Sequence, residues 1–178
     1  MNTKEFNPKI ISFEDLLSKK RKLIVPPFQR HYEWDKKDWK RFLQDIKDMT
    51  SSEDSEEMHF IGNIILNKSP NQDNTKLYTK YRIIDGQQRV TTFCIFLLAI
   101  KSLLNLDFPA DKREKDQIEE ILKIFEENNG QLIEKTLRIE LQESDELVFK
   151  EIVSAKDPNT RLIVMKWFIR DGNILLKN

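Results

Sequence analysis

The sequence predicts a single α+β domain. The stretches Met58–Leu66 and Leu77–Ile84 have the residue types of β-strands and a turn-rich loop between them, so they predict an antiparallel hairpin. The stretch from Arg89 to about Leu104 is apolar nearly all round and predicts a helix at the centre of the core. With 4 glycines, 6 prolines and 34% charged residues, the composition favours a helix-rich domain over a β-sandwich or a disordered chain.

Capping residues predict the elements before the hairpin. Ser12 followed by Asp15 is typical of a capping box and predicts a short helix that ends near Lys19. Leu23–Val25 predicts a short strand that two prolines stop. Asp35 is a good N-cap for the next helix. That helix has one apolar stripe at helical spacing, made of Trp39, Phe42, Leu43, Ile46 and Met49.

The part after the central helix is predicted to be mainly helical. We therefore expect one domain over residues 1–178, with an α+β core at 1–106 and a mainly helical extension at 107–178. The last predicted helix has apolar surface that needs a partner, and Asp171-Gly172 interrupts it, so we also expect the chain to be an N-terminal piece of a longer protein, truncated at its C-terminus. The predicted elements are a charged helix from Lys112 to Asn128, a strand at Thr136–Leu141, a helix capped by Ser144 that ends near Ala155, and a helix over Thr160–Asn178.

Charge and cysteine content exclude some classes of function. The 30 basic and 30 acidic residues give a net charge of zero, which excludes a domain that coats DNA by overall charge but not a local basic patch. The single cysteine, Cys94, lies in an apolar run and is interpreted as a core thiol in a reducing compartment. The apolar run Phe93–Ile100 is shorter than the roughly 20 residues of a membrane span. We expect a cytoplasmic protein.

Asp85, Gly86, Gln87, Gln88 and Arg89 connect the second hairpin strand to the central helix, and this connection is the first candidate site. A glycine at such a turn exposes main-chain N–H groups at a helix N-terminus, where anions bind. Arg89 could bind a phosphate, either glutamine could orient a water molecule, and Asp85 could hold Mg²⁺ or accept a proton. The alternative is structural, because Asp-Gly is a common turn and Asp85 is a good N-cap.

The segment from Phe28 to Trp34 is the second candidate site. Gln29 and Arg30 repeat the amide–guanidinium pair of the first site, and two such pairs could clamp a triphosphate or a DNA phosphate. Phe28, Tyr32 and Trp34 could stack on a flipped base. In the alternative, the aromatic residues are core anchors and Arg30 pairs with a neighbouring carboxylate.

The sequence lacks the motifs of several other enzyme classes. His31 has no second histidine or cysteine at metal-ligand spacing, so no zinc site is predicted. There is no H-N-H-like nuclease motif, no Walker A sequence and no GxSxG motif.

Three segments in this order, V-P-P-F-Q-R-H-Y-E-W, H-F-I-G-N-I-I-L and Y-R-I-I-D-G-Q-Q-R-V-T-T, resemble the N-terminal domain of GmrSD-type restriction systems. The DGQQR hallmark of that family matches residues 85–89. The Q-R-x-Y-x-W box matches Gln29, Arg30, Tyr32 and Trp34, and the F-x-G segment before the hairpin loop matches Phe60 and Gly62. The later stretch R-I-E-L-Q-E-S-D-E-L-V-F also resembles a recurrent strand-plus-helix segment of the family. The resemblance runs from about residue 10 to the end of the chain.

The resemblance implies a ParB/sulfiredoxin-like fold in which a small mixed sheet with a hairpin packs on the central helix. It also implies Mg²⁺-dependent binding and hydrolysis of a nucleoside triphosphate at the DGQQR motif. In that reading Gly86, Arg89, Gln29 and Arg30 bind phosphate, while Asp85, Gln87 and Gln88 are catalytic and Asp85 also holds the metal.

The implied partners are modified or phage DNA and an HNH-type nuclease, either as a C-terminal domain or as a separate subunit. An oligomer is also compatible with the resemblance, whereas a membrane partner is not expected. Two alternatives remain open from the sequence. One is a module that reads DNA or a modified base without hydrolysis. The other is a purely structural domain in which the DGQQR turn joins the hairpin to the central helix.

Overall fold

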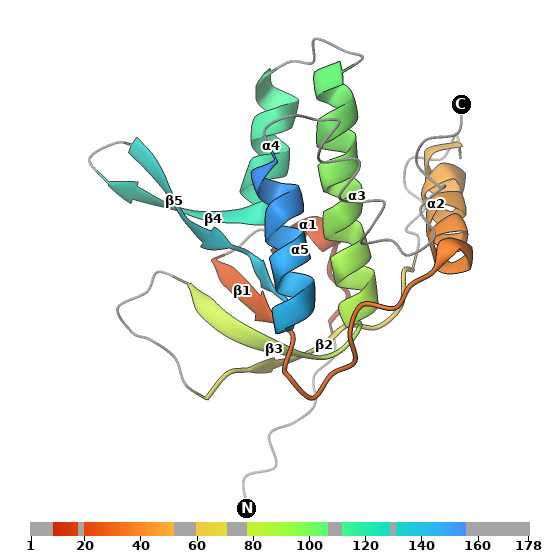
Figure 1. Ribbon diagram of the computed structural model, residues 1–178, viewed down its shortest axis with the longest axis horizontal. Helices are drawn as coiled ribbons and strands as arrows, with labels where there is room; N and C mark the ends of the chain where they lie inside the picture. The colour runs from red at the N-terminus through yellow and green to blue at the C-terminus, as the bar shows by residue number, and fades with distance from the viewer. Residues whose placement is uncertain are drawn as a thin grey trace, which may run out of the picture.

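The computed structural model describes residues 9–17, 20–51, 60–70, 78–106, 112–128 and 131–155. It confirms the predicted α+β class, with a four-stranded mixed sheet and a separate two-stranded sheet (Figure 1). The likeness to ParB and sulfiredoxin stays a prediction.

The order of the strands in the larger sheet determines where a site can form. This order is β2 (Ile65–Lys68), β3 (Thr79–Asp85), β1 (Arg21–Ile24) and β6 (Ile139–Glu140). β1 is parallel to both β3 and β6, whereas β2 is antiparallel to β3. The carboxyl ends of β1, β3 and β6 therefore lie at one edge of the sheet, which is the edge where ligands bind in open α/β sheets.

The β2–β3 pairing confirms the predicted hairpin, but β2 is shorter than expected. The expected strand began at Met58, which lies outside the described residues, and the observed strand begins at Ile65. Residues 60–64 are irregular, and Gly62 has a φ angle of 107°. A strand requires an extended backbone, so this left-handed glycine explains the late start.

The capping predictions for the first helices are confirmed. The Asp15 N–H donates to Ser12 Oγ at 2.9 Å at the start of α1 (Phe13–Leu17). At α2 (Lys36–Ser51), the Lys37 N–H donates to Asp35 Oδ1 at 2.7 Å. The Asp35 N–H donates in turn to Asp38 Oδ2 at 3.2 Å, which completes a reciprocal cap.

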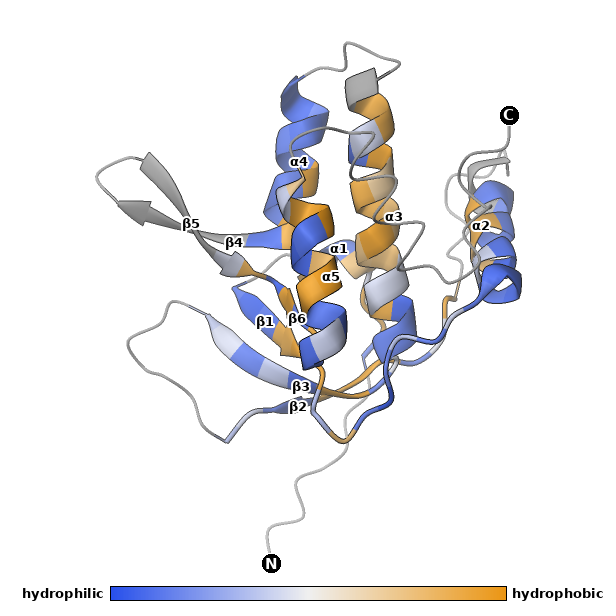
Figure 2. Ribbon diagram, in the orientation of Figure 1, coloured by the Kyte–Doolittle hydropathy of each residue, from blue (hydrophilic) through white to orange (hydrophobic). Residues whose placement is uncertain are grey.

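The core forms around α3 (Gln87–Leu106), as the sequence predicts. Figure 2 shows this helix apolar along most of its length, whereas α2 and α4 (Lys112–Leu122) each have a hydrophilic side. The sheet contributes its buried residues Leu23, Ile83 and Ile139 to the same core. The predicted stripe of α2 reaches α3 where the rings of Phe42 and Phe96 meet edge to face at 5.5 Å.

The chain after residue 106 differs from the prediction. The charged helix ends at Leu122 instead of Asn128, and β4 (Lys123–Asn128) pairs with β5 (Gln131–Leu137) as an antiparallel hairpin. Asn-Gly is a strong hairpin signal as well as a helix stop, and here the dipeptide 129–130 lies between two paired strands. The expected strand at 136–141 is divided between β5 and β6. The helix expected over 160–178 lies outside the described residues.

The helix α5 (Glu143–Ser154) begins one residue before Ser144, so the prediction that Ser144 is its N-cap is wrong. Gln142 is the N-cap residue, with an extended backbone and no side-chain capping bond. The described residues after position 106 thus contribute three strands as well as α4 and α5, and β6 belongs to the same sheet as β1.

Arg138, between β5 and β6, joins the end of α4 to the sheet. Its buried guanidinium donates to the carbonyls of Ile121, Glu120 and Lys123 at 2.7, 2.8 and 2.9 Å, and to Arg21 O at 3.3 Å. Three of these acceptors are at the carboxyl end of α4, where carbonyls lack partners within the helix. Burial lowers the pKa of Arg138 to about 10, an effect that Cys94 opposes, so the side chain remains charged at neutral pH.

Cys94 is buried in α3, as predicted, and burial raises the pKa of its thiol to about 12 although Arg138 acts in the opposite direction. Because only the thiolate reacts, we expect Cys94 of the folded protein to resist Ellman's reagent near pH 8. The same reagent should modify this thiol completely in guanidinium chloride. Rapid modification under native conditions would contradict the burial of the thiol.

Within the described part of the chain, no helix has the length and apolar character that crossing a membrane requires.

Candidate functional site at the carboxyl edge of the sheet

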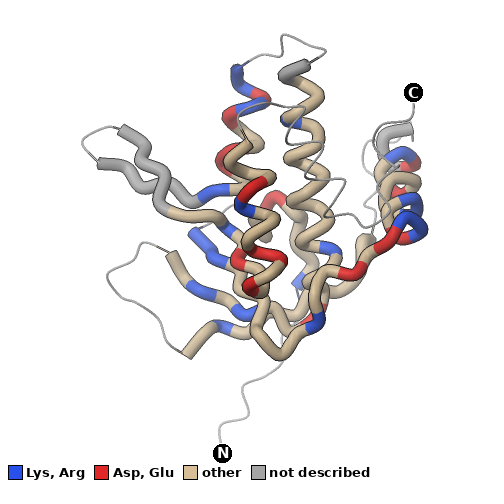
Figure 3. Tube along the Cα trace, in the orientation of Figure 1, with Lys and Arg blue, Asp and Glu red and all other residues tan. Residues whose placement is uncertain are grey.

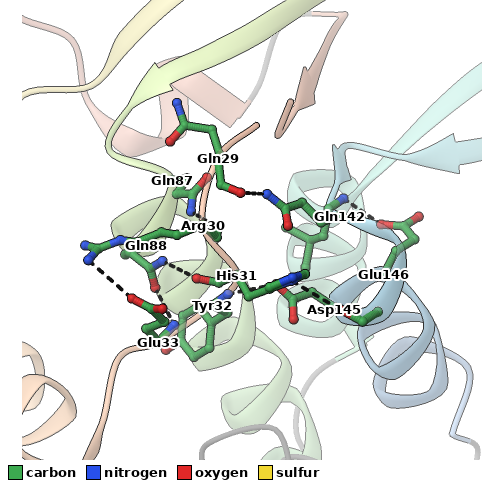
Figure 4. Close-up of polar contacts among 12 residues, drawn as sticks. Gln29, Arg30, His31, Tyr32, Glu33, Gln87, Gln88, Gln142, Asp145 and Glu146 are labelled. Carbon is green, nitrogen blue, oxygen red and sulfur yellow. Dashed lines mark hydrogen bonds and ion pairs between the residues drawn. The ribbon is translucent and has the colours of Figure 1, made fainter. Parts of the chain in front are cut away.

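Three segments meet beyond the carboxyl ends of β1, β3 and β6. After β1, the chain runs through residues 29–33 without regular secondary structure, and we call this segment the strap. Helix α3 begins directly after β3, and α5 begins directly after β6. Figure 4 shows the strap between side chains from these two helices. Both predicted sites, the DGQQR connection and the Phe28–Trp34 segment, therefore form one region.

The two glutamines of the DGQQR motif hold the strap from the side of α3. Gln88 Nε2 donates to the His31 carbonyl at 2.8 Å, and Gln88 Oε1 accepts the Glu33 N–H at 3.0 Å. Gln87 Nε2 donates to the Arg30 carbonyl. Both glutamines are buried. Both the nitrogen and the oxygen of the Gln88 side-chain amide thus bond to main-chain groups of the strap. These contacts favour the structural alternative, in which the residue holds the turn and binds no ligand.

Residues of α5 hold the strap from the opposite side. The Tyr32 N–H donates to Asp145 Oδ2 at 2.7 Å. Gln142 Nε2 donates to the Gln29 carbonyl and to Pro26 O, which explains why this N-cap side chain makes no capping bond. The main chain of the strap pairs with no β-strand, so side chains supply the hydrogen bonds that a neighbouring strand would otherwise make.

His31 approaches a serine and a carboxylate without forming a catalytic relay. Its Nδ1 atom lies 3.2 Å from Ser144 Oγ and 3.7 Å from Asp145 Oδ2. A Ser-His-Asp relay places the serine and the carboxylate on opposite ring nitrogens. Because both partners meet the same nitrogen here, the cluster fixes the orientation of the ring and does not activate Ser144.

The DGQQR turn crosses the segment before β2 at very close range. Gly86 has a φ angle of 91°, and a Cβ atom on it would lie 2.9 Å from Ile64 Cγ1 and 3.0 Å from the Asn63 carbonyl oxygen. The Arg89 side chain passes over Gly62 and donates to the Asn63 carbonyl. The motif therefore requires glycine at position 86, and the F-x-G segment supplies the space for Arg89.

The first turn of α3 presents unpaired donors. The main-chain N–H groups of Gln87, Gln88 and Arg89 have no hydrogen-bond partner within the described part of the chain, whereas the Val90 N–H donates to Gly86 O at 3.1 Å. Gln87 Oε1 is buried without a hydrogen-bond partner. The exposed Asp85 carboxylate lies beside this turn. These groups are the chemically uncommitted part of the motif, and Arg89, which the Asn63 carbonyl holds, lies in the same turn.

The remaining candidates of the Phe28–Trp34 segment differ in their exposure and in their contacts. Gln29 Nε2 donates to the Ile84 carbonyl at 3.0 Å, which ties the strap to β3. Arg30 is 64% exposed and pairs with Glu33 at 3.3 Å. Tyr32 is 8% exposed with its hydroxyl 2.8 Å from Thr92 Oγ1, so a base could reach its ring only after rearrangement. Burial raises the pKa of Tyr32, against the hydrogen bond with Thr92 that lowers it.

Two aromatic candidates differ from Tyr32 in their surroundings. Trp34 is partly buried and its ring lies 6.4 Å from that of Phe42, so it packs against α2. Phe28 is 75% exposed and is the candidate whose ring a ligand could reach directly.

Gln142, Asp145 and Asn63 belong to this region although none of them was predicted as a site residue. Gln142 and Asp145 lie 113 residues from the strap positions that they contact. A signal for Asn63 was present, because the Phe-x-Gly match directly precedes it.

Residues 13–171 match the family described as the GmrSD restriction endonuclease, N-terminal domain. The chain belongs to this family. No curated protein matches the chain. The match confirms the resemblance seen in the sequence, and membership in the GmrSD N-terminal family assigns the chain to a restriction system.

Proposed function

We propose that this GmrSD N-terminal domain is a nucleotide sensor, which binds and hydrolyses a nucleoside triphosphate and couples that step to nuclease action on DNA. The observation that carries the proposal is the first turn of α3. It combines unpaired N–H groups with Arg89 and the Asp85 carboxylate at the carboxyl edge of the sheet. Helix N-termini bind phosphate through such groups and through the helix dipole.

Arg89 and Arg30 are the proposed phosphate ligands. Arg89 is held by Asn63 and Gly62 in the same turn as the free N–H groups, so little ordering of its side chain is required. Arg30 is on the exposed side of the strap and would exchange its pairing with Glu33 for a phosphate oxygen. An exposed ion pair of this kind contributes about 0–1 kcal/mol, so the exchange costs little.

Mg²⁺ fits this site through one protein ligand. The described residues contain no group of three or more histidine, cysteine or acidic side chains arranged to hold a metal ion. Magnesium in nucleotide sites is commonly held by one or two carboxylates together with phosphates of the substrate. Asp85 would be that carboxylate, and the ion would neutralise charge on the phosphates. The Asp85 carboxylate has no hydrogen-bond or ion-pair partner among the described residues.

The two glutamines have different proposed roles. Gln88 has both ends of its amide engaged by the strap, so we assign it to positioning. Gln87 keeps an acceptor oxygen without a partner, so we assign it to placing the attacking water. The strap and α5 would then transmit the state of the nucleotide site toward the C-terminal part of the chain.

A second candidate function is a module that reads DNA or a modified base without hydrolysis. The observation that favours it is the exposed Phe28 ring beside the strap, because a base taken out of a duplex is held by stacking.

A nucleotide titration tests the proposed function. ATP, GTP, CTP and UTP are titrated with and without Mg²⁺ into the wild-type protein, Arg89→Ala and the control Arg41→Ala, which removes an exposed arginine from α2. We expect one nucleotide to bind, with at least tenfold weaker binding to Arg89→Ala and unchanged binding to Arg41→Ala, since charge-assisted bonds to phosphate contribute about 1.5–3 kcal/mol. Unchanged affinity in a folded Arg89→Ala protein would exclude this phosphate site.

A further inference from the structure

The four-stranded sheet has two chemically different faces. Leu23 of β1 and its register partner Tyr81 point toward the core on the side of the helices, as does Ile83. Because side chains alternate along a strand, the residues between them point to the opposite face. That face includes Lys22 and Ile24 of β1 and Lys80, Arg82 and Ile84 of β3.

This opposite face is basic although the chain has no net charge. Lys22 lies beside Lys80, and Lys20 precedes β1 in the same alternation. Glu140 of β6, the register partner of Ile24, is the acid on this face and pairs with Lys22 at 3.0 Å. The Lys22 side chain is 12% exposed and also donates to Thr136 Oγ1 at 2.9 Å, so its charge is already paired within the protein. The described strand residues of this face and Lys20 thus carry four cations and one anion, a formal charge of +3.

Figure 3 shows the same separation of charge along the chain. Basic segments gather on the strands of the sheet, whereas acidic segments gather at the start of α5. The Arg82 side chain has no hydrogen-bond or ion-pair partner among the described residues, so its charge is available to a ligand.

We propose that this basic face, whose cations besides the paired Lys22 are Lys20, Lys80 and Arg82, contacts the phosphate backbone of duplex DNA through these three residues. The identity of the polyanion rests on the proposed function, whereas the location rests on the sheet alone. Neighbouring strands are about 4.8 Å apart and alternate residues of one strand are about 7 Å apart, so the cations form a grid that spans several phosphates.

The composition of the face favours a duplex over a single strand. Proteins that bind single strands stack bases on aromatic side chains. The positions of β1, β2 and β3 on this face are Lys22, Ile24, Ile65, Asn67, Lys80, Arg82 and Ile84, and none of them is aromatic. Tyr78 is the aromatic residue that precedes β3 in the same alternation, as Lys20 precedes β1. Contact with the backbone is therefore the mode of binding that the strand residues support.

The basic face reaches the nucleotide site directly. Ile84 is the last residue of β3 on this face, and its carbonyl accepts the Gln29 amide of the strap. Asp85 follows it in the chain. A duplex on the sheet would therefore lie next to the strap and could influence the DGQQR turn.

The experiment uses the 178-residue chain and a short fluorescein-labelled duplex, with anisotropy measured over a series of salt concentrations. The test variant is Lys80→Gln with Arg82→Gln, and the matched control is Lys40→Gln with Arg41→Gln on the exposed side of α2. Each pair removes one lysine and one arginine. We expect the test variant to bind at least tenfold more weakly near 0.1 M salt and its log–log salt slope to be smaller by about 2, because each phosphate contact contributes roughly 0.9 to that slope.

Several outcomes would overturn the proposal. These are no duplex binding by the wild-type protein, an equal loss in the Lys40/Arg41 control, or tighter binding to a single strand of the same sequence. Loss of a dimer in light scattering, with no change in DNA affinity, would assign the face to a second copy of the chain instead. Nucleotide titration of the same variants separates the two proposals: nucleotide binding without duplex binding rejects this one, and salt-dependent duplex binding without nucleotide binding rejects only the proposed function.

Discussion

The Arg138→Met variant is expected to have a free energy of unfolding about 3 kcal/mol or more below that of the wild-type protein. The buried guanidinium donates to carbonyls of Glu120, Ile121 and Lys123, and also to Arg21 O. Methionine fills a similar volume but donates nothing, and each buried group left unpaired costs about 1–3 kcal/mol. Urea unfolding followed by circular dichroism measures the difference.

Two further variants define the cause of that loss. Arg138→Lys keeps a positive charge but cannot reach several carbonyls from one planar group, so we expect it to recover only part of the stability. Arg41→Ala removes an exposed arginine and should change the free energy of unfolding by less than about 0.5 kcal/mol. If Arg138→Met unfolds at the same urea concentration as the wild-type protein, the hydrogen bonds of Arg138 do not stabilise the contact between α4 and the sheet.

Local chemistry was sufficient to predict the parts of the fold that depend on neighbouring residues. Ser12 and Asp35 cap their helices through atoms two or three residues away, and such bonds can be recognised in a sequence. The β2–β3 hairpin and the apolar helix α3 are also predicted correctly, because each has its own periodicity.

The β4–β5 hairpin could not be predicted in the same way. Residues 123–128 continue the charged helical pattern of α4, so their own composition does not favour a strand. They become a strand by pairing with residues 131–137. Tertiary pairing overrode helix propensity here. The dipeptide Asn129-Gly130 is consistent with either outcome, and the prediction chose the wrong one.

The structure brings the two candidate segments together in one region, but the contacts of their individual residues could not be predicted from the sequence. A glutamine that orients water and a glutamine that holds a main-chain segment are the same residue type, and only the contacts of Gln87 and Gln88 distinguish them. The contribution of α5 was hidden because 113 residues separate Asp145 from Tyr32. Tyr32 itself matched a stacking residue and a core residue equally well, and its burial supports the second.

The difference between the two glutamines leads to the second large expected effect, which rests on the proposed function. We expect Gln87→Ala to lower kcat for nucleotide hydrolysis about 100-fold while the nucleotide dissociation constant changes less than threefold. A group that acts on the attacking water affects the transition state more than the bound substrate, and such groups contribute roughly 10²–10⁴-fold. The free Oε1 atom of Gln87 is the structural basis for this expectation.

Gln88→Ala should behave differently, because it removes both bonds that hold the strap at His31 and Glu33. We expect a loss of about 1–3 kcal/mol in the free energy of unfolding, since a main-chain donor and an acceptor lose their partners. Gln88→Glu should be at least as destabilising, because a carboxylate oxygen would face the His31 carbonyl at a separation near the present 2.8 Å.

Stability measured by urea unfolding, together with kcat, distinguishes the roles of Gln87 and Gln88. A stable Gln88→Ala protein with a large loss of kcat would reverse the assignment and make Gln88 the residue that places water. Equal loss of stability in both variants, with hydrolysis unchanged in the folded fraction, would leave the DGQQR glutamines as supports of the strap alone.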